Sequence, residues 1–192
     1  MIHRLYQWVM RLASHRHAVL WLAAISFAES SVFPIPPDVM LIPMVLAAPA
    51  RAWRLALVAT IASVAGGWLG YAIGAALYDG IGQRIIALYH LEAGFAAFQE
   101  MFRHYGGWIV LAKGVTPIPF KLVTIASGMV HLDPFVFTLS AIASRAVRFF
   151  LVAGLLHHFG APIREFVEER LVMVTSAALA LLLGGFLVFR WI

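Results

Sequence analysis

Apolar residues occur along this chain in runs of two different lengths. Three runs, residues 55–78, 134–156 and 171–189, are long enough to cross a hydrocarbon core of about 30 Å. Only Arg145 and Arg148 interrupt the second of these runs, and the other two carry no charged residue. The long runs therefore predict transmembrane helices, and the fold class that they indicate is an all-α integral membrane protein.

Shorter apolar runs come in two pairs, and a Pro-Ile-Pro sequence separates the two members of each pair. Proline has no backbone N–H and cannot continue a helix, and each short run is too short to cross by itself. In lipid, a broken backbone persists only where protein or a water-filled cavity surrounds it. Each pair therefore predicts a re-entrant hairpin that enters and leaves on one side, with a single broken crossing helix as the alternative. The breaks contain Pro34, Pro36 and Pro37 in the first pair and Pro117 and Pro119 in the second.

The same order of elements occurs twice, with the two Pro-Ile-Pro sequences 83 residues apart. An amphipathic helix precedes each hairpin, within residues 3–17 and 79–107, and a crossing helix follows it. One crossing separates the two units, so they enter the membrane from opposite faces, as in the inverted repeats of many transporters. The prediction is one membrane domain, 1–192, that contains a first repeat (1–78), a second repeat (92–158) and a C-terminal transmembrane helix (170–192).

Composition supports a membrane protein and excludes several other classes. Hydrophobic residues make up 62% of the chain and the mean hydropathy is +0.90, which is far outside the soluble range. The absence of cysteine excludes disulfides, thiol catalysis and cysteine-based metal sites. The net charge of +5 lies at membrane-flanking positions, where it contacts anionic headgroups, and no nucleic-acid motif is present. No motif for a serine nucleophile, a zinc hydrolase or a lipid phosphatase occurs, so we expect no enzyme, no metal and no cofactor.

Arg145 and Arg148 are the strongest indication of function. Arg145 lies eleven residues after Pro134, about 16 Å along a helix and thus near the middle of the bilayer. Arg148 is three positions further on and shares its face. Each arginine would cost roughly 2.5–3.5 kcal/mol at that depth. One interpretation is that they only neutralise buried acids; the other is that they bind an anionic group such as phosphate, which suits the planar donors of arginine.

Four more ionisable residues flank the two proline breaks. Glu29 and Asp38 flank the first, where a carboxylate either pairs with a cation or takes up a proton, as expected in an ion-coupled transporter. Asp38 has a local alternative, because Pro-Pro-Asp can form a turn or cap the next helix. Lys113 and Lys121 flank the second break and could assist the arginines, although Lys121 could instead extend to the membrane surface.

Together these features resemble the DedA family, the bacterial branch of the VTT or SNARE-associated Golgi protein superfamily, and its YqaA-like members in particular. The resemblance covers residues 15–160 and rests on the order of the motifs rather than on any one of them. The residues that support the resemblance are Glu29, the Phe-Pro-Ile-Pro-Pro-Asp sequence of residues 33–38, the glycine-spaced helix of residues 55–78, the segment 113–128, and Arg145 with Arg148.

The resemblance implies a multi-pass protein of the bacterial inner (cytoplasmic) membrane with two re-entrant hairpins that face each other. It implies transport of polyprenyl phosphate or phospholipid, with the proton-motive force implicated for some members, and the eukaryotic relatives are phospholipid scramblases. The essential acids of the family map onto Glu29 and Asp38, and its essential arginines onto Arg145 and Arg148. Better-studied members have arginines where this chain has lysines near the second break.

We therefore expect a flippase whose partners are an anionic lipid or lipid phosphate and the surrounding membrane lipids, with a homo-oligomer left open. Four cations would hold the phosphate and two carboxylates would couple protons. Two alternatives remain, a proton-coupled transporter of a small ion or solute and a non-transporting factor in membrane homeostasis. The expected phosphate-binding residues are Arg145, Arg148, Lys113 and Lys121, and the proton-coupling residues are Glu29 and Asp38.

Overall fold

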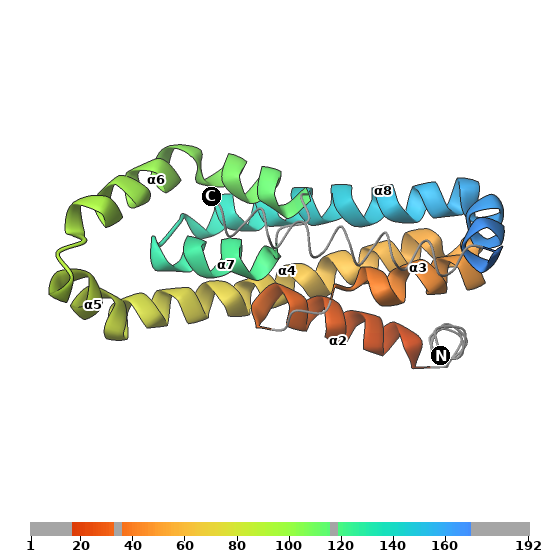
Figure 1. Ribbon diagram of the computed structural model, residues 1–192, viewed down its shortest axis with the longest axis horizontal. Helices are drawn as coiled ribbons and strands as arrows, with labels where there is room; N and C mark the ends of the chain where they lie inside the picture. Colours follow the sequence, from red (N-terminus) through yellow and green to blue (C-terminus); the bar gives the residue numbers. More distant parts are fainter. Residues whose placement is uncertain (1–16, 33–35, 116–118, 170–192) are drawn as a thin grey trace.

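A computed structural model describes residues 17–32, 36–115 and 119–169, without the side chains of residues 113–115, 161 and 163–169. The described residues form helices and connecting turns only, which confirms the prediction of an all-α protein for this part of the chain (Figure 1). The helices are α2 (Ala18–Ser31), α3 (Asp38–Ala47), the 3₁₀ turn η1 (Pro49–Arg51), α4 (Ala52–Leu77), the π-helical turn η2 (Tyr78–Gly82), α5 (Gln83–Leu88), α6 (Glu92–Val115), α7 (Phe120–Met129) and α8 (Pro134–Glu169). The predicted helix within residues 3–17, Pro34, Pro117 and the predicted C-terminal transmembrane helix (170–192) lie outside the described residues.

Two long helices, α4 and α8, run along most of the length of the molecule (Figure 1). Pro49–Leu88 and Pro134–Gly160 are both long and apolar enough to cross a membrane, with mean hydropathies of 1.6 and 1.7. This agrees with the first two crossing helices expected from the sequence. The helical segment Pro49–Leu88 and helix α8 both continue beyond the apolar runs, because hydropathy marks the lipid-facing part of a helix and not the residue where the helix ends.

The shorter helices lie at opposite ends of these two long ones. Figure 1 shows α2 and α3 toward one end and α5, α6 and α7 toward the other. Pro37 directly precedes α3 and Pro119 directly precedes α7. Proline suits these positions because the first backbone N–H groups of a helix have no partner within it. Helices α3 and α7 thus begin directly after prolines of the two proline breaks.

The prediction was wrong for α6, where an amphipathic helix and a separate short apolar arm were expected. The structure has one continuous helix over both, and Gly106 and Gly107 lie inside it. A Cβ at Gly106 would meet Leu132 Cδ1 at 2.5 Å, and a Cβ at Gly107 would meet Val136 Cγ1 at 3.1 Å. The glycine pair allows α6 to approach the start of α8 closely and does not end the helix.

A row of glycines on α4 forms the contact surface for both short helices. A Cβ at Gly66 would overlap the backbone carbonyl of Phe27 in α2, and one at Gly74 would overlap that of Ile125 in α7. The glycine-spaced face of this helix is therefore a packing face, and α2 and α7 occupy successive parts of it.

The contact between α7 and α4 is also close from the side of α7. A Cβ at Gly128 would overlap the carbonyl of Tyr71, whose own hydroxyl donates to the carbonyl oxygen of Leu132 at 2.7 Å. Gly128 lies inside α7, which continues to Met129. This glycine is required by close helix packing and not by a turn.

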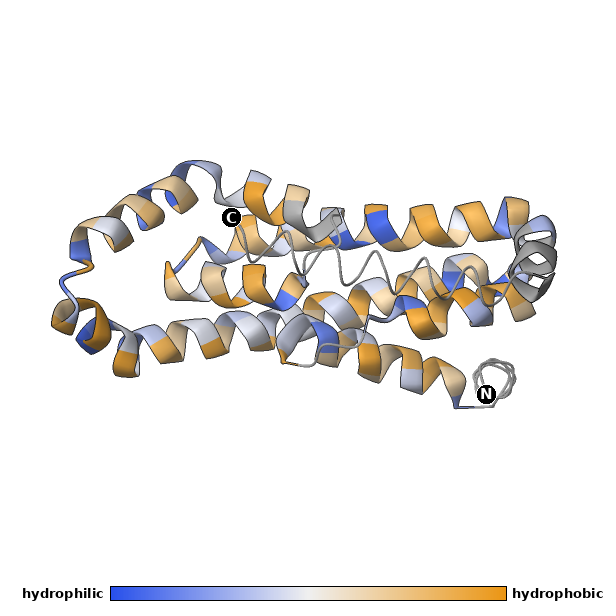
Figure 2. Ribbon diagram, viewed as in Figure 1, coloured by the Kyte–Doolittle hydropathy of each residue, from blue (hydrophilic) through white to orange (hydrophobic). Residues whose placement is uncertain are grey.

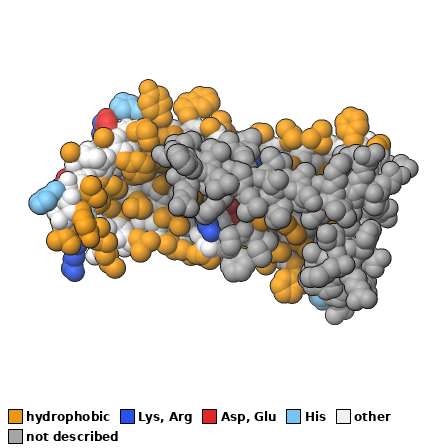
Figure 3. All heavy atoms as spheres, in the orientation of Figure 1, with side chains coloured by type: hydrophobic (Ala, Val, Ile, Leu, Met, Phe, Trp, Pro, Cys, Tyr) orange, Lys and Arg blue, Asp and Glu red, His pale blue; other side chains and the backbone are white. Residues whose placement is uncertain are grey.

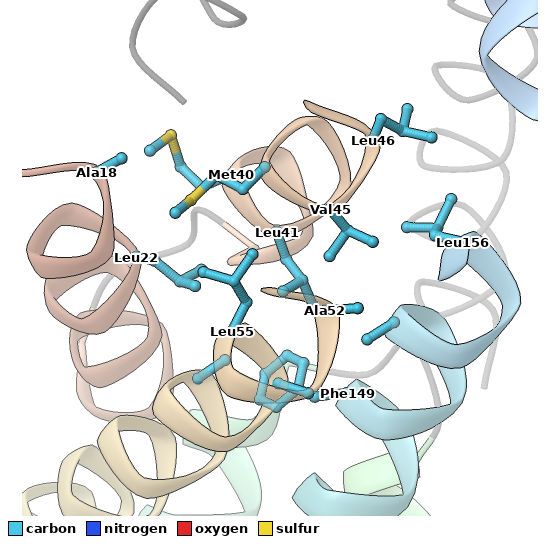
Figure 4. Close-up of a cluster of buried hydrophobic side chains, with 14 residues drawn as sticks. Ala18, Leu22, Met40, Leu41, Val45, Leu46, Ala52, Leu55, Phe149 and Leu156 are labelled. Atoms are coloured by element: carbon cyan, nitrogen blue, oxygen red, sulfur yellow. The ribbon is translucent and has the colours of Figure 1, made fainter. Parts of the chain in front are cut away.

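Two clusters of buried apolar side chains surround the middle of the molecule. Figure 4 shows the first cluster, in which α2, α3, α4 and α8 contribute side chains that include Leu22, Leu41, Leu55 and Phe149. The second lies between α6, α7 and α8 and includes Val110, Phe120, Val123 and Phe137. Phe149 of the first cluster and Phe120 of the second both contact Arg145, which belongs to the site described below.

Several large apolar side chains of the long helices are exposed, whereas a charged side chain is buried. Ile61 on α4 is 61% exposed and Leu139 on α8 is 58% exposed, whereas Arg145 on α8 is only 1% exposed. Hydrophobic colour extends over most of α3 and α8 in Figure 2, and hydrophobic side chains cover much of the visible described surface in Figure 3. An apolar exterior around a buried charge is the arrangement expected for a protein that is surrounded by lipid.

Candidate functional site

Two ion pairs connect the middle of α8 to the ends of the first pair of short helices. Arg145 Nη2 lies 3.0 Å from Glu29 Oε2 near the end of α2, and Arg148 Nη2 lies 2.6 Å from Asp38 Oδ2 at the start of α3. Because the two arginines are three residues apart on one helix, the end of α2 and the start of α3 must lie close together. The structure therefore brings four of the predicted site residues together.

Glu29 is 9% exposed and accepts hydrogen bonds on both carboxylate oxygens. Oε1 accepts from the backbone N–H of Phe120, the first residue of α7, at 3.2 Å. Oε2 accepts from Arg145 at 3.0 Å and lies 3.2 Å from the hydroxyl of Ser30. The carboxylate thus joins α2, α7 and α8, and it lies at the positive end of the α7 dipole.

Arg145 lies between two aromatic rings as well as beside Glu29. Its guanidinium carbon is 4.8 Å from the ring centre of Phe120 and 4.7 Å from that of Phe149. Cation–π contacts of this kind compensate part of the cost of removing the charge from water. Within the described part of the chain, Nε of Arg145 has no hydrogen-bond partner.

Asp38 and Arg148 form the more accessible of the two pairs, with side chains that are 20% and 21% exposed. Asp38 is the first residue of α3, and Pro37 occupies the N-cap position without a side-chain cap. The alternative that Asp38 caps this helix is therefore wrong. Its Oδ1 is buried and has no hydrogen-bond partner among the described residues.

Of the two lysines predicted for the site, the structure describes the side chain of Lys121 only. Lys121 lies in the first turn of α7, and its Nζ is 3.4 Å from the carbonyl oxygen of Val32, which follows α2. A cation is favourable there because the carbonyls at the end of a helix carry partial negative charge. Lys121 is thus placed beside the end of α2 and not on either carboxylate. The side chain of Lys113 lies outside the described residues.

Several residues that complete the site were not predicted for it. Phe120 contributes a backbone N–H and a ring, Phe149 contributes a second ring, and Ser30 lies 2.6 Å from Ser63 of α4 through their hydroxyl oxygens. Buried serines inside apolar runs were the only signal in the sequence, and they do not indicate their partners. Thr124 of α7 also contacts this region, because its hydroxyl donates to the carbonyl oxygen of Ser30 at 3.0 Å.

A cavity of about 880 Å³ lies apart from the ion pairs, between α6 and α8. Its lining is polar at Arg103 and His131 and apolar at Trp108 and Leu139, and it extends along α8 as far as Ala143, two residues before Arg145. In the described residues, no group of three or more His, Asp or Glu side chains is placed to hold a metal ion. The chemistry that this arrangement offers is exchange of ionic partners on buried arginines.

An all-helical chain with an apolar exterior, two helices of membrane-spanning length and paired charges at the ends of broken helices defines a membrane-associated protein. The VTT domain family matches residues 35–158, and the chain belongs to this family, whose domain is that of the DedA and SNARE-associated proteins.

Two relatives are similar over most of their length. The chain is 39% identical over 168 residues to an uncharacterized protein of Haemophilus influenzae, which covers 85% of this chain and 87% of the relative. An uncharacterized protein of Histophilus somni has the same identity over the same length and the same coverage. No solved structure matches the chain.

Proposed function

We propose that the protein moves an anionic lipid, either polyprenyl phosphate or a phospholipid, across the bacterial inner membrane as a multi-pass transporter. The observation that carries this proposal is the pair of arginines in the interior of an apolar helix bundle, each held by a carboxylate at the end of a broken helix. Membership of the VTT domain family supports it.

A purely structural role accounts poorly for these charges. Well-packed apolar residues in place of a buried ion pair are often neutral or stabilising by about 1–4 kcal/mol, so packing alone does not require two arginines at this depth. A phosphate group does require them, because the guanidinium fork binds two phosphate oxygens at once. The partly exposed pair of Arg148 and Asp38 is the more accessible part of such a site.

The proposed architecture is an inverted repeat of two re-entrant hairpins, α2 with α3 and α6 with α7. The position of these helices at opposite ends of α4 and α8 supports this arrangement (Figure 1). Transport would then proceed by rocking of one half against the other around a central site. The cavity between α6 and α8, polar at one part and apolar at another, suits a lipid with a headgroup and a chain.

Proton coupling follows from competition for the same cations. Glu29 and Asp38 hold the arginines while they are ionised, and a protonated carboxylate releases its arginine to the phosphate. Lys121, and Lys113 if it lies nearby, would add positive charge at the second break. Binding and movement of the lipid need no covalent step, so the proposal includes no enzymatic reaction.

Reconstitution of the purified protein into liposomes tests this function. Labelled polyprenyl phosphate and labelled phospholipids are followed separately, with and without a pH gradient, to identify the lipid and any proton coupling. Arg148→Ala should abolish movement of the lipid while the protein still accumulates in the membrane. Arg84→Ala is the matched control, because Arg84 is an exposed arginine of α5 that belongs neither to the two ion pairs nor to the lining of the cavity between α6 and α8.

The same preparation separates the alternatives. Flux of a small cation or solute without lipid movement would identify the protein as a secondary transporter of that solute. Full activity of the Arg148→Ala protein in the lipid assay would refute the phosphate-binding role. A protein that moves neither lipids nor solutes, and whose charge-neutral variants still support membrane homeostasis in cells, would be a non-transporting factor.

A further inference from the structure

We propose that the Glu29 carboxylate is the resting occupant of an oxyanion site, and that the lipid phosphate takes its place during transport. The site consists of the Arg145 guanidinium, the backbone N–H of Phe120 and the hydroxyl of Ser30. This inference rests on the proposed function and adds to it the residues that bind the phosphate.

The donors around Glu29 come from three different elements and converge on one carboxylate. Arg145 and Ser30 face Oε2, at 3.0 Å and 3.2 Å, while the Phe120 N–H faces Oε1 at 3.2 Å. Ser63 can donate to Ser30 at 2.6 Å, and the single hydroxyl hydrogen of Ser30 is then shared between the carboxylate of Glu29 at 3.2 Å and the carbonyl oxygen of Ser26 at 3.0 Å. A charged donor on one oxygen and a helix N-terminus on the other is a common arrangement for binding phosphate.

A second observation points to a ligand at the same place. The side chain of Arg145 is only 2% exposed, yet its Nε has no hydrogen-bond partner in the described part of the chain. Glu29 therefore uses only part of the donor capacity of this arginine. A phosphate group has more acceptor oxygens than a carboxylate, and two of its oxygens can engage a guanidinium as a fork.

The rings of Phe120 and Phe149 make the site selective for an anion that arrives without its water. They cover both sides of the guanidinium at 4.8 Å and 4.7 Å, so donors remain only in the plane of the group. A lipid phosphodiester or monoester that enters the bundle is desolvated in this way, whereas neutral headgroups have no charge to compensate Arg145. The ligand class is thus an organic phosphate, of which polyprenyl phosphate and anionic phospholipids are two sources.

Chemical rescue tests this assignment in the full-length protein in detergent micelles. Glu29→Ala removes the carboxylate and leaves space for a small anion, and the unfolding temperature is measured at constant ionic strength. Formate, inorganic phosphate and butyl phosphate should each raise the unfolding temperature of the E29A protein by several degrees in a saturable manner. Chloride and the neutral acetamide should not, and the wild-type protein should not respond to formate because its site is occupied.

Glu100→Ala is the matched control, because Glu100 also lies 3.0 Å from an arginine, Arg103, but both side chains are mostly exposed. Its unfolding temperature should not depend on which anion is present. Glu29→Ser provides a second variant without the carboxylate in case E29A accumulates poorly. If either variant accumulates only when formate is present, that result supports the oxyanion site. The oxyanion site is refuted if neither variant accumulates in the presence of any of the three anions, or if none of the three anions stabilises either variant.

The lipid assay keeps this inference separate from the function on which it rests. Anion rescue without any movement of lipid in liposomes would retain the oxyanion site and refute the transport proposal. Lipid movement by the wild-type protein without anion rescue of E29A would refute the oxyanion site and retain transport. Rescue by butyl phosphate together with movement of polyprenyl phosphate but not phospholipid would assign the lipid source.

Discussion

Neighbouring glycines of α4 allow a sharp test of the helix contact that brings Glu29 to Arg145. A Cβ at Gly66 would overlap the backbone carbonyl of Phe27 in α2. A Cβ at Gly67 would meet only side-chain atoms at ordinary van der Waals distances, the nearest being Thr124 Cγ2 at 3.4 Å. Both glycines are buried in the same helix. The two alanine variants therefore differ only in the atoms that the new Cβ contacts.

The magnitudes follow from two opposing effects. Alanine in place of glycine inside a helix is favourable by about 0.8–1.0 kcal/mol, and Gly67→Ala should show most of this gain. At Gly66 the neighbouring atoms are backbone, so they cannot rotate away and α2 must shift. Overpacking of this kind costs about 1–3 kcal/mol, which exceeds or cancels the helical gain. Gly66→Ala should therefore be the less stable of the two variants by about 1–3 kcal/mol.

The assay is thermal unfolding in detergent micelles, followed by tryptophan fluorescence. For a chain of this length, each kcal/mol corresponds to about 2–4 °C in the unfolding midpoint. Gly94→Ala serves as a control for the helical effect alone, since no atom lies within 4 Å of its Cβ. Equal midpoints for the Gly66 and Gly67 variants, or the reverse order, would refute the close contact between α2 and α4.

The remaining predictions concern polar contacts and use denaturant unfolding of the same preparation. Glu29→Gln should lower the free energy of unfolding by about 3–5 kcal/mol, because Arg145 would stay buried without a counter-charge. The double variant Glu29→Met with Arg145→Met should recover most of that loss, and simple additivity would contradict the pairing. Asp38→Asn should cost less than Glu29→Gln because a fifth of the Asp38 side chain is exposed, so an equal or larger loss would be inconsistent with this geometry. Tyr71→Phe should cost about 0.5–1.5 kcal/mol through the lost hydrogen bond to a backbone carbonyl, and an unchanged stability would argue against that bond.

The amino-acid sequence was sufficient to predict the two long helices, the starts of two short ones and the residues that form the two ion pairs. Long apolar runs predicted the two long helices because a membrane-spanning helix needs a minimum apolar length. Prolines predicted the starts of α3 and α7 because proline cannot lie within the backbone hydrogen bonding of a helix. Arg145 and Arg148 stood out because charges inside apolar runs are costly. These are local properties, which a sequence states directly.

The partners of these residues could not be predicted in the same way. Glu29 and Arg145 are separated by 116 positions, and their contact depends on how far each helix continues and how it is rotated. The sequence left open whether Asp38 caps α3 or pairs with an arginine, and only the position of α8 decides between them. The Phe120 N–H carries no side-chain signal at all, because every residue except proline has one.

The charged centre is assembled from both halves of the chain, and this has a mechanical consequence. Glu29 comes from the first pair of short helices, the Phe120 N–H comes from α7, and Arg145 comes from α8. Any movement that separates α2 from α7 and α8 must therefore break the contacts of this carboxylate at the same time. Because an unpaired buried charge is costly, such a movement is favourable only when another anion or a proton compensates for the loss. In the transport cycle that we propose, opening of the bundle and exchange of the anion on Arg145 would thus be the same event, which is the coupling that a transporter of anionic lipid requires.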